Sequence, residues 1–378
     1  MTRPPVVVAG GGLAGAAFAA CLAVRGTPVT VLERTAVPGA GEAEALAPGV
    51  HAVLSGLGLS GRVHEAGFAR GEVSVLGWGN GEEPWRSAFA ETGGIDHGYH
   101  VCLGALVELL LQRAGECGAR VVRGAEVIEP VTDGGRVTGV VVHTAGQTET
   151  LPARLVADAT GTARVVAGRF CAAEPDPLSH RVFRAVAPAD ATTEQGAFVL
   201  EGAPGEWHWR IPLAGGVVGL GRLVPGGGGD AGGDDGERWR GYRCARLAGA
   251  GWLSVGDAAG LADPAFLDPA TVALLAAQAA ASAVPVLCGD EAEEAARGYM
   301  DCYAPVVECA RAFAAFCLDP ARHGENTETL LRGFTAFAAG EHGGALARIR
   351  AALAGHRPLF DVEYPLGPLV ASLAMPER

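Results

Sequence analysis

The sequence contains no lysine, because all 29 of its basic residues are arginine. Reactions that need a lysine amine, such as Schiff-base formation, are therefore excluded. Clusters of basic residues are also absent, and the 42 acidic residues bring the net charge to −13. This charge balance offers no surface for phosphate backbones or anionic lipids, so we expect neither nucleic acid nor a membrane as a partner.

Paired cysteines and long hydrophobic runs are missing as well. The nine cysteines lie scattered without a CxxC motif, so the sequence predicts neither a metal site nor a disulfide framework. The apolar N-terminal segment lacks a basic region followed by an uninterrupted apolar core, and residues 270–284 are too weakly hydrophobic to span a bilayer. We therefore expect a cytoplasmic protein with reduced thiols.

Glycine, by contrast, is abundant, with 57 residues, and one glycine cluster follows the first apolar run. The β-branched residues 5–9 predict a strand, the Ala/Leu-rich residues 16–25 predict a helix, and residues 28–33 predict a second strand. A strand, a glycine turn, a helix and a strand in this order form a βαβ unit. The sequence thus begins with the unit from which dinucleotide-binding folds are built.

The glycine turn has the spacing GxGxxG, formed by Gly10, Gly12 and Gly15. These glycines permit the tight turn and let a pyrophosphate approach the N-terminus of the next helix. Glu33 ends the second strand, where a carboxylate can accept hydrogen bonds from the ribose hydroxyls. We therefore predict a dinucleotide site, with further contacts from neighbouring residues of the turn and strand: Leu13, Ala14 and Arg34.

Two later segments repeat the pattern of a strand followed by a turn. Asp158 and Gly161 follow the apolar residues 155–157, and Gly256 and Asp257 follow the apolar segment GWLSV. The segment GDAAG resembles the GD motif of group A flavoprotein monooxygenases. The resemblance implies that the dinucleotide is FAD and that Asp257 contacts its ribityl chain. The other contacts implied around these motifs are Glu44, Asp158, Gly161, Gly256, Ala259, Gly260 and Pro264.

Four longer segments resemble the tryptophan-halogenase-like flavoproteins. They are EALAPGVHAVLSGLGL, GYHVCLGALVELLLQRA, WHWRIP and GDAAGLADPAF, which occupy residues 44–59, 98–114, 207–212 and 256–266. WHWRIP matches the WxWxIP signature of halogenases. On these motifs the chain is identified as a member of the tryptophan-halogenase-like, group A FAD-dependent monooxygenase superfamily.

The resemblance implies an α/β protein with a Rossmann-like FAD-binding fold of the p-hydroxybenzoate-hydroxylase type. An inserted antiparallel β-sheet substrate domain and a helical C-terminal region complete that fold. The FAD-binding domain corresponds to residues 1–70, 101–170 and 246–290, the sheet domain to 71–100 and 171–245, and the helical region to 291–378. Residues 225–237, rich in glycine and acidic residues, are expected to form a loop in the sheet domain.

Two departures from the family pattern argue against halogenation. Halogenases of this family use a lysine that captures hypohalous acid, and this sequence has none. They also hold halide with backbone N–H groups at the start of the Ala-rich helix, where here Pro269 has no N–H and Asp268 brings a negative charge. Asp268 and Pro269 are equally typical of a well-capped helix start. We therefore expect a non-halogenating member.

Five residues are candidates for catalysis or for shaping the substrate site. Trp207 and Trp209 alternate along a predicted strand and so share one face, although core packing accounts for them equally well. His51 and His100 lie in family-like segments and are candidate general bases, although a lone histidine is more often structural. Asp268 would place a carboxylate at a helix start close to the flavin.

The resemblance implies an FAD-dependent monooxygenase of bacterial secondary metabolism. Reduced FAD would react with O₂ to give a C4a-hydroperoxide that hydroxylates an electron-rich substrate, either an aromatic small molecule or one bound to a carrier or peptide. The reducing equivalents would come from NAD(P)H directly or through a separate flavin reductase. Two alternatives stay open, which are an FAD-dependent dehydrogenase or oxidase and a degenerate flavin-binding protein that docks a partner.

Overall fold

The computed structural model describes most of the chain up to residue 304 and two later positions. The described residues are 3–36, 42–77, 83–92, 95–176, 179–203, 206–226, 236–261, 269–289, 294, 296–301, 303–304, 311 and 314. Most of the expected loop 225–237 and of the expected helical region 291–378 lies outside these ranges. Within them, no helix is both long enough and apolar enough to cross a membrane.

The central layer is a six-stranded sheet in the order β20-β21-β12-β1-β2-β8. All neighbouring strands are parallel except β20 and β21. The strands are Val6–Ala9 (β1), Val29–Glu33 (β2), Arg120–Arg123 (β8), Leu155–Asp158 (β12), Ala248–Gly249 (β20) and Trp252–Ser254 (β21). Every residue of β1, β12 and β21 is buried, which is typical of a parallel sheet covered on both faces.

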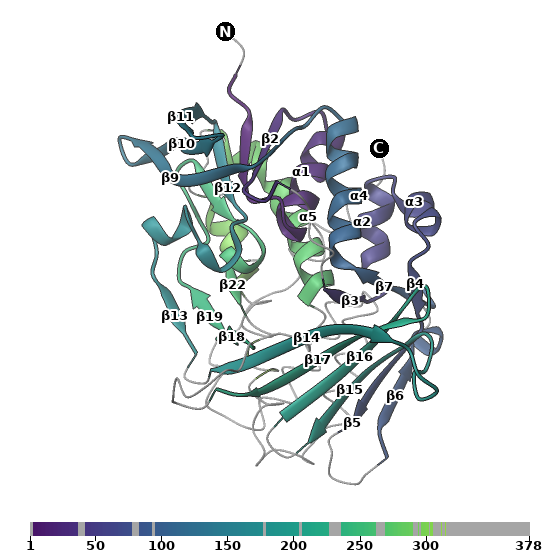
Figure 1. Ribbon diagram of the computed structural model, residues 1–378. Coiled ribbons are helices and arrows are strands. Elements are labelled where there is room, and N and C mark those ends of the chain that lie inside the picture. Colours follow the sequence, from purple (N-terminus) through teal and green to yellow (C-terminus); the bar gives the residue numbers. More distant parts are fainter. Residues whose placement is uncertain are drawn as a thin grey trace.

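Helices cover one face of this sheet (Figure 1). α1 (Leu13–Val24) packs against both α4 (Leu103–Glu116) and α5 (Pro269–Leu287). Five of its six alanines are buried, and their small side chains let the neighbouring helices approach closely. α2 (Val50–Gly56) packs against α5 and is followed by α3 (Ser60–Glu65).

A three-stranded antiparallel sheet covers the opposite face of the central sheet. Its order is β11-β10-β9, with β9 at Ala125–Asp133, β10 at Arg136–Thr144 and β11 at Gln147–Pro152. Val137 and Val140 of β10 belong to the same buried core as Val7 of β1 and Trp252 of β21. The sheet therefore seals the face that the helices leave open.

Short elements connect these layers to the rest of the chain. Two small sheets have the orders β3-β7-β4 and β13-β19-β22. Their strands are Ala43–Leu46 (β3), Ala69–Gly71 (β4), Gly98–Cys102 (β7), Ala173–Pro175 (β13), Tyr242–Cys244 (β19) and Gly260–Leu261 (β22). The 3-10 helices are Phe89–Thr92 (η1), Gly161–Ala163 (η2), Ala167–Arg169 (η3) and Gly256–Ala258 (η4).

A seven-stranded sheet lies across the lower part of the molecule in Figure 1. Its order is β18-β14-β17-β16-β15-β5-β6, and only β5 and β15 are parallel. The strands are Val73–Gly77 (β5), Trp85–Ala88 (β6), His180–Pro188 (β14), Ala197–Ala203 (β15), Glu206–Leu213 (β16), Val217–Pro225 (β17) and Glu237–Trp239 (β18). The sequence prediction of an α/β fold with an added, mainly antiparallel sheet is confirmed.

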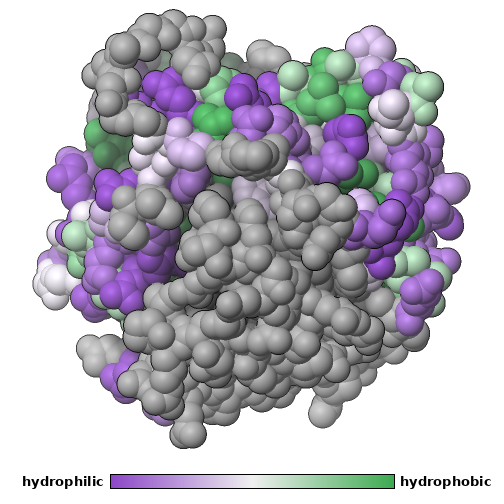
Figure 2. Space-filling view, turned by 90° about the horizontal axis from the view of Figure 1, so that it is seen from below, coloured by the Kyte–Doolittle hydropathy of each residue, from purple (hydrophilic) through white to green (hydrophobic). Residues whose placement is uncertain are grey.

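The two faces of the seven-stranded sheet differ. Trp207, Trp209 and Ile211 of β16 are buried, whereas His208 and Arg210 between them are partly exposed. We call the face with the tryptophans the inner face, because its Gly219 on β17 abuts Ala43 of β3 in the FAD-binding half. The face with His208 and Arg210 is the outer face. Seen from below, the described surface residues are mostly hydrophilic (Figure 2).

One predicted boundary was wrong. The helix expected at residues 16–25 begins at Leu13, so that Gly15 belongs to its first turn. A Cβ on Gly15 would overlap the carbonyl oxygen of Gly10. Gly15 is therefore required for close packing inside the helix rather than for a turn before it, which the glycine spacing alone does not reveal.

Candidate FAD site

The glycine turn between β1 and α1 has the shape that a dinucleotide site needs. Gly10 has φ +100°, which favours glycine, and a Cβ there would overlap the carbonyl oxygen of Ala159. Gly12 is the N-cap of α1 and makes no side-chain capping bond. No described atom lies within 4 Å of a Cβ built on Gly12, so the space in front of the helix is open.

This open helix end is a site for an anion. The first turn of α1 contains no acidic residue, and its first backbone N–H groups have no side-chain acceptor. The helix dipole adds a partial positive charge at the same place. Leu13 and Ala14 of that turn are partly buried. The arrangement fits the pyrophosphate of FAD.

Glu33 is fixed beside this turn by two backbone groups. The N–H of Gly11 donates to Oε2 at 2.6 Å, and the N–H of Thr35 donates to Oε1 at 2.8 Å. The carboxylate at the end of β2 is thus oriented before any ligand binds, and each oxygen retains a lone pair for a ribose hydroxyl. Arg34, the next residue, is exposed at the surface.

The GD motif comes into direct contact with the glycine turn. Gly256 has φ +60°, and a Cβ there would lie 2.5 Å from the Cβ of Ala14 in α1. Ala259 and Gly260 after the motif are buried. Two segments far apart in the sequence therefore form one wall, as a site for one extended dinucleotide requires.

Asp257 is the exposed residue of the GD turn. Its side chain is solvent-accessible, although its neighbours Gly256 and Ala258 are buried. Desolvation by the surrounding protein raises the pKa of its carboxyl group, and Arg184 partly offsets that effect. Asp257 is therefore the residue of this turn whose side chain a ligand can reach. The hydroxyl of Tyr242 donates to the carbonyl oxygen of Asp257 at 2.6 Å and holds this turn in place.

Asp158 has a different position from the one the sequence suggests. Its side chain is fully buried, and its carboxylate accepts hydrogen bonds from the backbone N–H groups of Thr160, Val166 and Ala167 and from the Thr160 hydroxyl. The carboxylate therefore has all four of these hydrogen bonds with groups of the protein. Asp158 thus shapes the turn that contains Gly161, which has φ +62°, and does not present its carboxylate to a ligand.

Arg164 connects two turns of the site and was not predicted from the sequence. Its side chain is buried and donates to the carbonyl oxygens of Ala258 and Cys171, at 3.4 and 2.7 Å. Its guanidinium also lies over the ring of Tyr242, 5.7 Å from the centroid. The only sequence signal was an arginine three residues after the glycine of a turn, which is too common to be diagnostic.

The acidic segment after β2 reaches the seven-stranded sheet. Glu42, which precedes β3, accepts an ion pair from Nε of Arg184 at 2.9 Å. Arg184 also was not predicted, because it belongs to the distant strand β14 and has no local motif. Glu44 lies two residues further along, in β3, and is partly buried.

Trp207 and Trp209 lie on the inner face and are 4% and 5% exposed. The ring of Trp209 lies against Gly221 of the neighbouring strand, where any side chain would overlap it. The inner face is thus an aromatic surface turned toward the FAD-binding half.

The two predicted general bases differ in environment. His100 is 2% exposed, and its Nδ1 lies 2.9 Å from the carbonyl oxygen of Pro212. Burial lowers its pKa to about 4, so the imidazole is neutral at physiological pH. His100 therefore has a structural role. Its ring extends from β7 to Pro212 of β16 and packs against Gly71 of β4.

His51 belongs to a cluster of rings at the start of β7. Its Nε2 lies 3.0 Å from the carbonyl oxygen of His97, and its ring centroid lies 4.8 Å from that of His97 and 5.1 Å from that of Tyr99. Desolvation lowers the pKa of His51. With Nε2 as donor, Nδ1 is the free acceptor of a neutral imidazole. None of these contacts reaches the turns of the FAD site.

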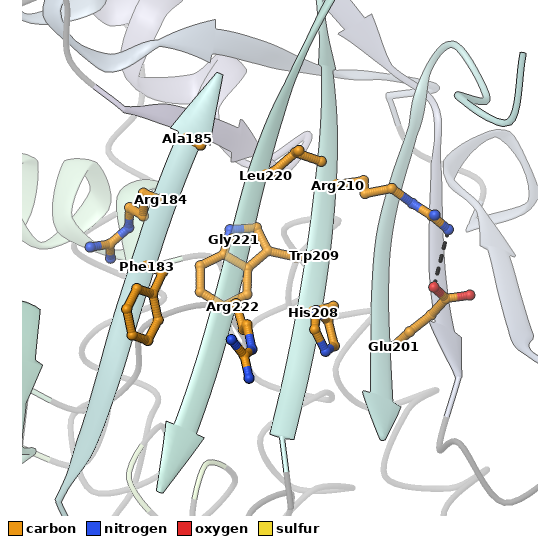
Figure 3. A pocket seen from close by; sticks show the side chains of 10 residues that line it. All are labelled: Phe183, Arg184, Ala185, Glu201, His208, Trp209, Arg210, Leu220, Gly221 and Arg222. Atoms are coloured by element: carbon orange, nitrogen blue, oxygen red, sulfur yellow. Dashed lines mark hydrogen bonds and ion pairs between the residues drawn. The ribbon is translucent and has the colours of Figure 1, made fainter. Parts of the chain in front are cut away.

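Two predicted residues, Pro264 and Asp268, lie outside the described residues. The outer face of the sheet, by contrast, is well described and has a cavity of about 440 Å³ (Figure 3). Arg222 lies over the ring of Phe183 there, and Arg210 pairs with Glu201 at 3.1 Å. Residues of both faces line this cavity, because Trp209 and Arg184 contribute to it beside His208, Arg210 and Arg222.

Comparisons with known proteins agree with this geometry. Residues 3–172 match the family described as FAD binding domain. A tryptophan 2-halogenase from Chondromyces crocatus is 26% identical over 229 residues, which are 58% of this chain and 43% of that protein. The chain thus spans less than half the length of the curated relatives it matches.

Solved structures share the fold over nearly the whole chain. The myxobacterial chondrochloren halogenase, an FAD-dependent halogenase, has a TM-score of 0.75 at 22% identity and covers 95% of this chain and 98% of its own. Aklavinone-11 hydroxylase, solved with FAD and aklavinone, has a TM-score of 0.68 at 18% identity and covers 84% of this chain and 69% of its own. The described glycine turns, the oriented carboxylate of Glu33 and the exposed side chain of Asp257 fit FAD. Residues 3–172 thus match an FAD binding domain, and the chain has the fold of FAD-dependent halogenases and hydroxylases.

Proposed function

We propose that the protein is an FAD-dependent monooxygenase that hydroxylates an electron-rich substrate, either a free aromatic compound or one attached to a carrier or peptide. The observation that supports this most directly is the contact of Gly256 with Ala14, which joins the two turns expected to bind FAD. When bound, FAD supplies the activation of O₂. The residues of the chain bind and orient the cofactor and the substrate and shield them from water.

Each group of residues has a separate task in this proposal. The open N-terminus of α1 binds the pyrophosphate, and Glu33, already oriented by Gly11 and Thr35, accepts the ribose hydroxyls. Asp257 holds the ribityl chain from the GD turn. Trp207 and Trp209 exclude water on the substrate side, which suppresses side reactions of the reduced cofactor.

We propose hydroxylation rather than halogenation because the chain has no lysine to carry an activated halogen. The proton released from the hydroxylated substrate needs an acceptor. His100 is unsuited to this task, since it is buried and bonded to Pro212. His51, with a free nitrogen on a neutral ring, stays the candidate base. NAD(P)H, used directly or through a flavin reductase, would supply the electrons.

The test is oxygen consumption by the FAD-loaded protein with free phenols, indoles and pyrroles, followed by mass spectrometry of the product. We expect NAD(P)H-dependent O₂ uptake, with or without an added flavin reductase, and a product heavier by one oxygen atom. Anaerobic bleaching of the flavin by substrate alone would instead establish the dehydrogenase or oxidase alternative. Purified protein that is colourless and takes up no FAD would contradict both enzymatic functions.

A further inference from the structure

The cavity of about 440 Å³ on the seven-stranded sheet spans three neighbouring rows of directly paired residues (Figure 3). The two outer-face rows are Phe183, Arg222, His208 and Glu201, and Ala185, Leu220 and Arg210. The row between them is Arg184, Gly221 and Trp209. Residues paired in this way project to the same side of a sheet, so seven of the ten lining residues belong to the outer face.

The size and the lining of this cavity suit a small organic molecule. Sites for such molecules measure about 300–1,000 Å³ and combine apolar contacts with a few polar groups. The outer face offers apolar contacts at Phe183 and at Leu220, which is 37% exposed. It also offers the polar side chains of Arg222, His208 and Arg210. A molecule that fills the cavity therefore meets a ring, an aliphatic side chain and two guanidinium groups.

The charge of the lining favours an anion. The described residues that line the cavity include three arginines and one glutamate, although the whole chain has a net charge of −13. Glu206, which pairs with Arg222, is not one of these described lining residues. The carboxylate that balances Arg222 thus lies outside the cavity, whereas the guanidinium lies in its wall.

Glu206 holds Arg222 and His208 in fixed positions. Its Oε2 accepts hydrogen bonds from Nε and Nη2 of Arg222, at 2.8 and 2.7 Å, and its Oε1 lies 2.9 Å from Nε2 of His208. These contacts with His208 and Arg222 lower the pKa of the Glu206 carboxyl group. The guanidinium of Arg222 also lies over the ring of Phe183, 5.8 Å from the centroid. Arg222 is thus oriented before any molecule binds.

Arg222 retains donors for a second acceptor. A guanidinium has five N–H groups in a planar fork, and Glu206 uses only the edge formed by Nε and Nη2. Among the described residues, no acceptor pairs with Nη1 of Arg222. The edge formed by Nη1 and Nη2 can therefore bind a carboxylate through two parallel hydrogen bonds.

Arg210 supplies a second cation close to the first. It pairs directly with Leu220 across β16 and β17, which makes it a diagonal neighbour of Arg222, about 7–8 Å away between Cα atoms. Its Nη2 makes one contact with Oε2 of Glu201 at 3.1 Å, and these two side chains are 38% and 45% exposed (Figure 3). Ion pairs at such exposure contribute little to stability, so Arg210 can exchange Glu201 for another anion.

We propose that this cavity is a binding site for an aromatic carboxylic acid, distinct from the FAD site. The carboxylate pairs with the Nη edge of Arg222, and the aromatic ring covers Leu220. The guanidinium of Arg210 lies beside that ring and adds a cation–π attraction. The ten described lining residues include neither Glu33 nor the glycine turns, so the site does not depend on the proposed function. The alternative role of these arginines is to join neighbouring strands through ion pairs alone.

The experiment measures binding of benzoate and of indole-3-carboxylate to the full chain by titration calorimetry. We expect both acids to bind. Their neutral amides, benzamide and indole-3-carboxamide, should bind at least about tenfold more weakly, because they lose the charged hydrogen bonds to arginine. Acetate should also bind about tenfold more weakly, because it has no ring to cover Leu220. If the arginines only join strands, neither aromatic acid binds.

Two variants locate the bound acid. Arg222→Gln removes the anchoring charge and should weaken benzoate binding at least about tenfold. Leu220→Glu leaves the ion pairs of Arg222 and Arg210 in place and puts a carboxylate where the ring would lie, so it should weaken binding by a similar factor. Arg169→Gln, which breaks the exposed pair of Arg169 with Glu129, is the matched control and should bind benzoate like the wild type. Thermal unfolding checks that each variant is folded.

A wild-type protein that binds neither aromatic acid, or that binds acetate as tightly as benzoate, would overturn the inference. Benzoate affinity that is unchanged in both Arg222→Gln and Leu220→Glu would also overturn it, and a shift of the flavin absorption during the titration would then place the acid at the cofactor. A protein that binds benzoate at this cavity but takes up no FAD would contradict the proposed function and leave this inference standing.

Discussion

The Cβ of Ala14, in the first turn of α1, lies 2.5 Å from the place a Cβ would occupy on Gly256, in the turn after β21. One contact thus joins the segment expected to hold the pyrophosphate to the segment expected to hold the ribityl chain. No other residue fits at position 256 without displacing α1 or the GD turn. The contact fixes the relative position of the two turns, which neither motif indicates by itself.

Gly256→Ala should therefore impair the FAD site. The backbone at φ +60° costs a non-glycine residue about 1–3 kcal/mol, and the new methyl group also overlaps Ala14. We expect FAD affinity to fall at least about tenfold, measured by quenching of flavin fluorescence. Gly61→Ala is the matched control, because Gly61 lies in α3 with no described atom near its Cβ position. Unchanged affinity in Gly256→Ala would mean that this turn does not contact the cofactor.

Glu33→Gln should weaken FAD binding without unfolding the protein. The amide keeps an acceptor for one of the two N–H groups but faces the other with its own N–H, and it loses the charge that strengthens ribose hydrogen bonds. Hydrogen bonds to charged groups contribute about 1.5–3 kcal/mol, so the dissociation constant should rise about tenfold or more. Titration calorimetry checks this, with Glu129→Gln at the exposed Arg169 pair as the control.

Asp158→Asn should mainly destabilise the fold. The side chain is fully buried and accepts four hydrogen bonds, so an amide would turn two donor hydrogens toward N–H groups. Leaving buried donors unpaired costs about 1–3 kcal/mol each. We expect a lower urea midpoint with an unchanged slope. If Asp158→Asn instead lost FAD affinity at full stability, Asp158 would be a direct cofactor contact after all.

His100 should make the protein less stable in acid. Its pKa is about 4 in the folded protein and 6.5 ordinarily, so the unfolded chain binds the proton more readily. The stability contribution is complete above pH 6.5 and is lost as the pH falls toward 4. At about 1.4 kcal/mol per pKa unit, the loss between pH 7 and pH 4.5 is about 2.4 kcal/mol. The measurement is the free energy of unfolding at pH 4.5 and pH 7 in the wild type and in His100→Gln, whose pH dependence should be smaller by this amount. His143→Gln, at an exposed histidine, should match the wild type.

The FAD-binding half could be predicted because its signals are local in the sequence. The βαβ unit, its glycines and Glu33 lie within one short stretch, and the contacts that fix them are made largely inside it. The residues that could not be predicted are positioned by contacts with residues distant in the sequence. Arg184 meets Glu42 only because the fold brings the distant strand β14 next to the segment that precedes β3. His100 is positioned by the carbonyl of Pro212, a partner that no spacing near His100 indicates.

The last prediction concerns Trp209. The alternation of Trp207 and Trp209 along the sequence predicted that they share one face of a strand, but not which part of the protein that face contacts. The ring of Trp209 lies against Gly221 and is 5% exposed on the side turned toward the FAD-binding half. Trp209→Leu replaces the indole ring with a smaller side chain. This change should let water reach the inner face. Replacing such a buried ring should cost about 3 kcal/mol or more of stability. If the inner face shields the reaction, a larger share of the consumed NAD(P)H should also appear as hydrogen peroxide. Leu220→Ala on the outer face should change neither quantity appreciably. Loss of stability without more peroxide would make Trp209 a core residue only.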